Sequence, residues 1–135
     1  MTRFARLVAL AWALPATLAG LAFALPALAL GARAARAGGA LAVLGHPWMR
    51  RRCAITLGHV VCYGRGCGPA TSLAPGVTLA DHERQHVRQA ERLGPLYLPA
   101  HLAFGLWAVL RNGRWHGAAN RLERGPLAVP PRPWP

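Results

Sequence analysis

The N-terminal part of this 135-residue chain contains an uncharged, almost wholly apolar stretch of 24 residues, Leu7 to Leu30. A helix of about 20 apolar residues is long enough to cross the roughly 30 Å of hydrocarbon in a bilayer. Arg3 and Arg6 precede the stretch, as in a signal peptide. Its apolar core, however, is longer than the roughly 7–15 apolar residues that are typical of signal peptides. We therefore expect residues 1–31 to form a retained transmembrane anchor or uncleaved signal, with a cleaved signal peptide as the alternative.

The rest of the chain divides by composition into three parts. Residues 32–39 are small and glycine-containing, with two arginines, as in flexible linkers. Residues 40–125 contain several apolar runs and have the size of one domain. Residues 126–135 are rich in proline and are expected to be extended. The sequence therefore predicts one domain between a linker and a tail.

The chain has a formal net charge of +12, and all 16 of its basic residues are arginine. The arginines are spread along the chain, and no recognisable nucleic-acid-binding motif accompanies them. Arginine beside apolar segments suits the anionic headgroups of lipids. We therefore expect membrane lipid, and not nucleic acid, as a partner.

Residues 82–86 read His-Glu-Arg-Gln-His, which is an H-E-x-x-H motif. On a helix, positions i and i+4 lie on one face, so His82 and His86 can reach the same metal ion, with Glu83 beside them. Zinc binds imidazole nitrogens, and a neighbouring Glu can take a proton from a water molecule at a catalytic zinc site. Asp81 is a good N-cap, which predicts a helix over residues 81–93. The motif therefore predicts a site for Zn²⁺ with Glu83 as the general base.

Two short apolar runs precede the motif. Residues 40–44 lie between glycines, and residues 53–62 are rich in β-branched side chains. The segment between them is turn-like, so the two runs are expected to form a β-hairpin. Residues 64–78 carry several glycines and prolines and are expected to be a loop.

The three cysteines are an odd number, which excludes a complete disulfide framework. Cys62 and Cys67 bracket a turn-like segment and could close a small loop in an oxidising compartment. As metal ligands, the pair has a weak spacing and lacks a second pair. The sequence favours buried or incidental thiols.

A second uncharged segment, residues 94–110, follows the motif helix. Pro95 and Pro99 move the expected start of its helix to about Pro99, which leaves about 12 residues or roughly 18 Å. This length is too short to span a bilayer, and His101 lies within the segment. We expect a buried or half-inserted interfacial helix, with a second transmembrane helix as the alternative. A further short helix is expected over residues 118–124.

A catalytic zinc ion usually has three protein ligands, so the His pair needs a partner. Glu123 is a candidate because it is the one carboxylate after Glu91 in a chain with four acidic residues. The other candidates are the histidines outside the motif, His46, His59, His101 and His116. Spacing alone leaves these alternatives open.

Two segments, HERQHVRQAERLGPLYLPA (82–100) and WHGAANRLER (115–124), resemble a group of small bacterial membrane-associated proteins of the H-E-x-x-H type. In that group, a strand with a Gly-His-Val core precedes the motif helix and an Asn-x-x-Glu segment follows it. Gly58-His59-Val60 and Asn120–Glu123 match these features in order. The arrangement is similar to minimal gluzincins, which are zinc metalloproteases with a downstream Glu as third ligand.

This resemblance implies that His82, His86 and Glu123 bind zinc and that Glu83 is the general base. The chain departs from larger gluzincins because it lacks a clear second domain and a clear Tyr or His that could stabilise the transition state. His116 is a candidate for that last role.

We expect an α+β fold, with an N-terminal transmembrane helix followed by a minimal zincin-like core of a β-hairpin, the motif helix and two further helices. The expected activity is hydrolysis of a peptide bond in a peptide or protein substrate. An extended substrate would pair with the exposed edge of a strand. That strand comprises Ala54, Ile55, Thr56, Leu57, Gly58 and His59. The alternative is a non-catalytic membrane protein with a structural or vestigial zinc site.

The expected location is the bacterial inner membrane, crossed once. Arginines on the two sides of the apolar stretch nearly balance, and Arg50–Arg52 favour a cytoplasmic domain. A disulfide-closed loop or a cleaved signal would favour the exterior instead.

Overall fold

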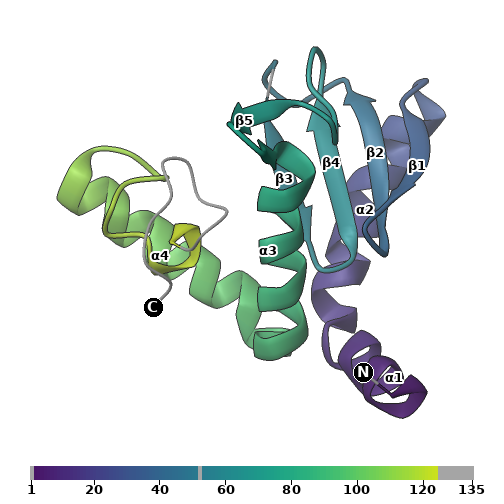
Figure 1. Cartoon of the computed structure of the whole chain (residues 1–135), viewed down its shortest axis with the longest axis horizontal. Coiled ribbons are helices and arrows are strands. Elements are labelled where there is room, and N and C mark those ends of the chain that lie inside the picture. The colour runs from purple at the N-terminus through teal and green to yellow at the C-terminus, as the bar shows by residue number, and fades with distance from the viewer. Residues whose placement is uncertain (1, 52, 125–135) are drawn as a thin grey trace.

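A computed structural model describes residues 2–51 and 53–124 of the chain. Two N-terminal helices, a mixed four-stranded sheet, a small β-hairpin and two C-terminal helices make up most of the fold (Figure 1). The α+β class predicted from the sequence is therefore confirmed.

The main sheet has the strand order β1-β2-β4-β3. Its strands are β1 (Arg33–Ala37), β2 (Ala40–His46), β3 (Ala54–Leu57) and β4 (Val60–Gly64). The β2 and β4 strands run parallel, whereas β1 and β3 pair antiparallel with their neighbours at the two edges. The arrangement places β3 at the edge nearest the H-E-x-x-H helix (Figure 1).

The predicted hairpin between residues 40–44 and 53–62 is wrong. The second run turns back on itself at Gly58-His59 and forms the β3–β4 hairpin, with Gly58 at a φ of 62°. Glycine tolerates this left-handed conformation because it has no Cβ. The first run pairs with β1, which lies inside the segment 32–39 that was expected to be a flexible linker.

The apolar N-terminal stretch forms two helices, α1 (Arg3–Trp12) and α2 (Leu14–Ala29), which meet at an angle of 64°. The small residues of α2 are buried, and its Ala24 packs with Val43 and Val60 of the sheet. A Cβ at Gly20 would lie 2.6 Å from the backbone oxygen of Leu57, so glycine permits this close approach. The α2 helix is therefore part of the same packed unit as the sheet.

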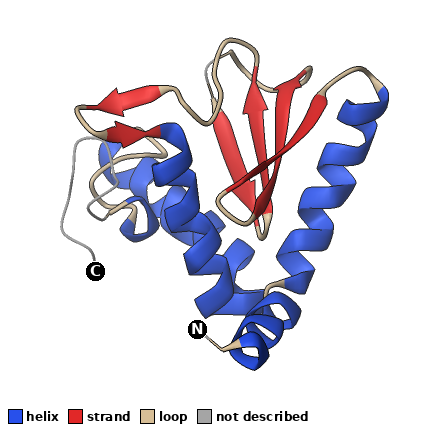
Figure 2. Cartoon of the chain, turned by 45° about the vertical axis from the view of Figure 1, so that its right-hand side comes forward, coloured by secondary structure: helices blue, strands red, loops and turns tan. Residues whose placement is uncertain are grey.

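The opposite face of the sheet is covered by α3 (Leu79–Leu93), which carries the H-E-x-x-H motif. Leu79 and Val87 of this helix pack with Val61 and Tyr63 of β4. The sheet thus lies between α2 and α3, as Figure 2 shows from the side. This sandwich fixes α3 against the sheet and directs its remaining face toward the C-terminal segment.

The α3 helix begins two residues earlier than predicted. Its N-cap is Thr78, and the side chains of Thr78 and Asp81 form a capping box, in which Asp81 accepts a hydrogen bond from the Thr78 backbone N–H. The preceding loop contains a short hairpin of β5 (Ser72–Ala74) and β6 (Val77–Thr78) within the segment predicted to lack regular structure.

A 3₁₀ turn, η1 (Gly94–Leu96), joins α3 to α4 (Tyr97–Asn112). The α4 helix starts before Pro99, because proline is tolerated in the first turn, where its missing N–H would have no partner within the helix. The predicted short helix at 118–124 is a single 3₁₀ turn, η2 (Arg121–Glu123).

One helical stretch among the described residues, Leu79–Asn112, is long and apolar enough by itself to cross a membrane. Helices α1 and α2 meet the same test when they are taken together as one bent span. Core helices and signal sequences also pass this test, and only 22% of the most apolar window of Leu79–Asn112 is buried. By length and composition, the single unbroken candidate span of the described residues therefore lies in the C-terminal part, and not at residues 1–31, where the sequence predicted one transmembrane helix.

None of the three cysteines forms a disulfide bond. Cys62 is buried beside Val43 and Val60, and burial raises the pKa of its thiol to about 11. The small loop that a Cys62–Cys67 disulfide would close is therefore absent from the structure.

Candidate metal centre

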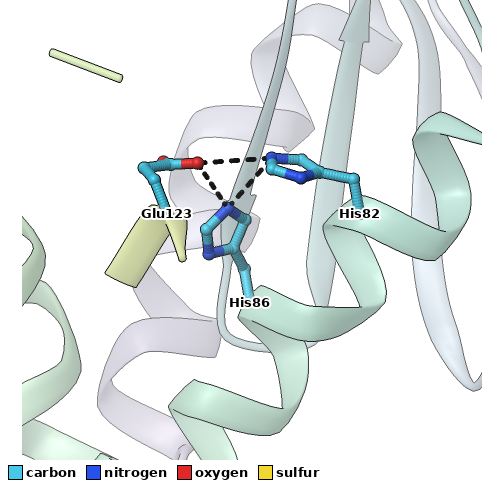
Figure 3. Close-up of side chains that lie close together, drawn as sticks. All are labelled: His82, His86 and Glu123. Atoms are coloured by element: carbon cyan, nitrogen blue, oxygen red, sulfur yellow. Dashed lines mark hydrogen bonds and ion pairs between the residues drawn. The ribbon is translucent and has the colours of Figure 1, made fainter. Parts of the chain in front are cut away.

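Three side chains from two distant segments converge on one point. His82 and His86 extend from one face of α3, and Glu123 from η2 points toward them (Figure 3). The His82 Nε2 and His86 Nε2 atoms are 3.3 Å apart, and they lie 3.4 and 3.5 Å from Glu123 Oε2. The three atoms therefore form a nearly equilateral triangle.

The triangle has the size that a tetrahedral zinc ion requires. Ligand atoms at 2.0–2.1 Å from a tetrahedral centre are separated by about 3.3–3.4 Å. Two imidazole nitrogens and one carboxylate oxygen are also a donor set that zinc accepts, although other first-row divalent ions bind the same donors. The residues present fit a metal ion, and three protein donors leave one tetrahedral position for water or substrate.

Gln89 contacts both segments that supply the donor atoms, the α3 helix and the η2 turn. Its Oε1 accepts a hydrogen bond from His86 Nδ1 over 2.8 Å, which leaves His86 Nε2 facing Glu123. Its Nε2 donates to the backbone oxygen of Leu122 over 2.8 Å. Hydrogen bonds of this kind fix the orientation of metal ligands and increase their basicity. One α3 side chain thus holds a motif histidine and the residue before Glu123.

Two further contacts hold the Glu123 segment in place. Gln85 Nε2 donates to the backbone oxygen of Arg124 over 2.8 Å. The fully buried Asn120 caps η2, because its Oδ1 accepts from the Leu122 N–H, and its Nδ2 donates to the Trp115 oxygen. Glu123 is therefore positioned by hydrogen bonds on both sides of η2.

The three donor groups are coupled electrostatically. Burial opposes the charge on His86, but the hydrogen bond and charge of Glu123 outweigh it and raise the pKa of His86 to about 9. Burial also opposes the Glu123 carboxylate, yet hydrogen bonds from His82 and His86 hold the pKa of Glu123 well below its usual range. Glu123 is therefore an anion at neutral pH, as a carboxylate that binds a metal must be.

Glu83 is buried beside the donor triangle but is not one of its members. Its Oε2 accepts a hydrogen bond from Thr56 Oγ1 on the edge strand β3 over 2.6 Å. The backbone oxygen of Thr56 in turn accepts from the Tyr97 hydroxyl over 3.2 Å. These contacts tie the motif glutamate to β3 and to the start of α4.

A cavity of about 300 Å³ is lined by the donor triangle, Glu83 and Thr56. Its walls combine the donor triangle and Glu83 with apolar side chains, including Phe23 from α2 and Trp115 from the loop after α4. Two further histidines line it, namely His101 and His116. The group is therefore open to a small molecule or to a peptide side chain.

The structure separates the histidines that the sequence left as candidates. His59 lies in the β3–β4 turn, where its Nε2 is 3.1 Å from Glu91 Oε1, and His46 donates to the backbone oxygen of Phe23. Neither belongs to the donor group, whereas His101 and His116 line its cavity. Of the strand expected to bind substrate, Ala54, Ile55 and Thr56 line the cavity.

Sequence reasoning missed Gln85 and Tyr97 as parts of the site. It placed Thr56 only in the strand expected to bind substrate, and Asn120 only in the Asn-x-x-Glu segment. Gln89 could have been recognised, because it lies one turn after His86 on the same helix face. The roles of Thr56 and Tyr97 depend on contacts between distant segments and leave no local signal.

Comparison with known proteins adds no assignment. No protein family, curated protein or solved structure matches this chain.

Proposed function

We propose that this protein is a membrane-associated zinc metallopeptidase of minimal gluzincin type. The observation that carries the proposal is the triangle of His82, His86 and Glu123 donor atoms, with Glu83 beside it and a cavity in front. A zinc ion held there would polarise the substrate carbonyl group and increase the acidity of a water molecule.

Glu83 is placed to act as the general base. Its carboxylate would take a proton from the attacking water, whose oxygen forms a bond to the carbonyl carbon while the carbonyl π electrons move to oxygen. When this adduct collapses, the C–N bond breaks and Glu83 returns the proton to the departing amine. The short hydrogen bond from Thr56 holds the carboxylate in position for both transfers.

The edge strand β3 offers backbone groups to an extended substrate. Leu57 and Val60 flank a two-residue turn and form a hydrogen-bonded pair, so Thr56 opposite Val61 turns its N–H and C=O toward the outer edge. The Tyr97 hydroxyl already binds the Thr56 carbonyl. Pairing of a substrate strand would therefore use the Thr56 N–H and the backbone of Ala54.

The exposed apolar surface supports attachment to a membrane. Apart from Trp48 and Ile55, the large exposed apolar side chains of the described residues lie on α1, α2, η1 and α4 or at their ends. A surface of this kind marks contact with lipid or with another protein, and the +12 charge favours anionic lipid. Because α2 also packs on the sheet, the domain would lie directly against the inner membrane. It would not be connected to the membrane by a separate, flexible anchor.

The alternative is a non-catalytic membrane protein with a structural zinc site. Structural zinc sites use four protein ligands, whereas three donors converge here among the described residues. The presence of a buried carboxylate and a cavity beside those donors favours catalysis.

The test is metal analysis and peptide hydrolysis on the purified full chain. We expect about one zinc per chain, lost in His82→Ala, His86→Ala and Glu123→Ala. Glu83→Gln should retain the metal and lose hydrolysis of a casein-type substrate, because it removes the base alone. Glu91→Gln is the matched control and should keep the metal. Full zinc content in the two His variants would refute the site, and equal hydrolysis by wild type and Glu83→Gln would refute the mechanism.

A further inference from the structure

His101 is the residue of α4 that reaches the metal centre. It lines the cavity, and its Nε2 lies 4.0 Å from Oε1 of Glu123. The oxygen of Glu123 that faces His82 and His86 is the other one, Oε2. His101 therefore stands beside the donor triangle and is not one of its corners.

The ring of His101 is held by its neighbours. It stacks on Tyr97 with a centroid distance of 5.6 Å and an interplanar angle of 15°. Trp115 meets it edge-on at 6.0 Å, and the His86 ring lies 5.3 Å away. Tyr97 itself is fixed by its hydrogen bond to Thr56. The orientation of the imidazole is thus set by an aromatic cluster.

The two ring nitrogens of His101 have different surroundings. Nδ1 is buried and has no hydrogen-bond partner among the described residues, whereas Nε2 faces the carboxylate of Glu123 across the cavity. A buried N–H without an acceptor costs about 1–3 kcal/mol. The proton is therefore favoured on Nε2, which gives the cavity an N–H donor aimed at its interior.

We propose that His101 is a catalytic residue, which donates a hydrogen bond from Nε2 to the carbonyl oxygen of the scissile peptide bond. The negative charge that develops on this oxygen, as water adds to the carbonyl carbon, would strengthen the bond in the transition state. This inference rests on the proposed peptidase function and names the donor for it. It assigns to His101 the role that the sequence suggested for His116.

The decisive variant is His101→Phe, which removes the donor and keeps a ring to stack between Tyr97 and Trp115. We expect kcat on a fluorogenic peptide to fall by about 10²–10³-fold, with KM nearly unchanged. Affinity for a phosphinate peptide, which imitates the tetrahedral adduct, should fall by a similar factor. Zinc content, zinc affinity and the thermal unfolding midpoint should stay at the wild-type values, since Nε2 is not a ligand.

His116→Phe is the competing variant in the same cavity, and its kcat should fall less than about tenfold. A weaker zinc affinity in His101→Phe would make His101 a ligand and overturn the proposal. Wild-type kcat and phosphinate affinity in His101→Phe, or a large loss confined to His116→Phe, would also overturn it. Failure of the proposed peptidase function has a different signature, because wild type itself would then neither hydrolyse peptides nor bind the phosphinate.

Discussion

Gln89 on α3 donates a hydrogen bond to the backbone oxygen of Leu122, the residue that precedes Glu123. The same side chain accepts from His86. The helix that supplies two donor atoms therefore also positions the segment that supplies the third, although this segment lies far along the chain.

Substitution of Gln89 should weaken metal binding without removing a ligand. In Gln89→Met, the His86 ring loses its acceptor and the Leu122 carbonyl loses its donor. Changes at such supporting residues typically lower metal affinity by about 10–100-fold. Competition with a chromophoric chelator measures the effect, and Arg88→Met on the exposed face of α3 is the control. Equal zinc affinities in the two variants would show that Gln89 does not support the site.

Zinc affinity should rise with pH. The pKa of His86 is raised from 6.5 to about 9, under the influence of Glu123, Glu83 and Gln89, so zinc must displace a proton below that pH. We expect the apparent affinity to increase by up to about tenfold per pH unit between pH 6.5 and 9, and then to level off. Chelator competition across this range tests it, and an affinity independent of pH would contradict it.

Stability of the metal-free protein should depend on the same two groups in opposite directions. Because the folded pKa of His86 is raised, its contribution is complete below pH 6.5 and is lost as the pH rises through about 9. Because the pKa of Glu123 is lowered, its contribution is present above pH 4.5 and is lost as the pH falls. Urea unfolding of the chelator-treated protein should therefore show a stability that falls as the pH rises from about 6.5 to 9, and that falls again below about pH 4.5. A stability that increases steadily from pH 6 to 9 would argue against this account of His86.

The contact between α2 and the sheet should be sensitive to a single methyl group. In Gly20→Ala, the new Cβ would lie 2.6 Å from the Leu57 oxygen and 2.8 Å from Val60 Cβ. Overpacking of this kind costs about 1–3 kcal/mol. Gly68→Ala is the control, because a Cβ there meets no atom within 4 Å. Urea unfolding of both variants measures the difference, and equal midpoints would contradict the packing of α2 on the sheet.

The outer face of α4 should contribute to membrane binding. Leu106 and Leu110 are 51% and 81% exposed, and transfer of a leucine side chain to an apolar phase is worth about 1.5–3 kcal/mol. Leu106→Glu and Leu110→Glu should each lower partition into vesicles that contain anionic lipid by about tenfold or more. Ser72→Glu adds the same charge on the exposed β5 strand and should have a smaller effect. Equal partition of all three variants would exclude α4 from the lipid contact.

The parts of the site that could be predicted from the sequence are those set by local geometry. His82, Glu83 and His86 share a helix, and helical spacing alone places both imidazoles on one face. Glu123 was only one of several candidates on spacing, and the resemblance singled it out. Its position depends on Gln85 and Gln89, whose partners lie far away in the sequence, and on Asn120, whose partners are local.

The strand pairing could not be predicted for a related reason. The run from Cys53 to Cys62 looked like one strand because its β-branched residues continue across Gly58-His59, where the chain turns. Parallel pairing of β2 with β4 joins segments that are not consecutive, and no local pattern encodes such a partner. The same holds for β1, whose small residues resemble those of a linker.

The donor atoms come from both α3 and η2. A bound ion would therefore cross-link these two segments in addition to its part in catalysis. An ion held by His82, His86 and Glu123 would close a loop that includes α4 and the turn at Trp115, and would reduce the entropy of that part of the chain. The α4 helix itself makes few contacts with the sheet. Its packing against the rest of the domain would therefore be coupled to occupancy of the metal site. Removal of the metal would then loosen this segment, and bound zinc would protect it from proteolysis.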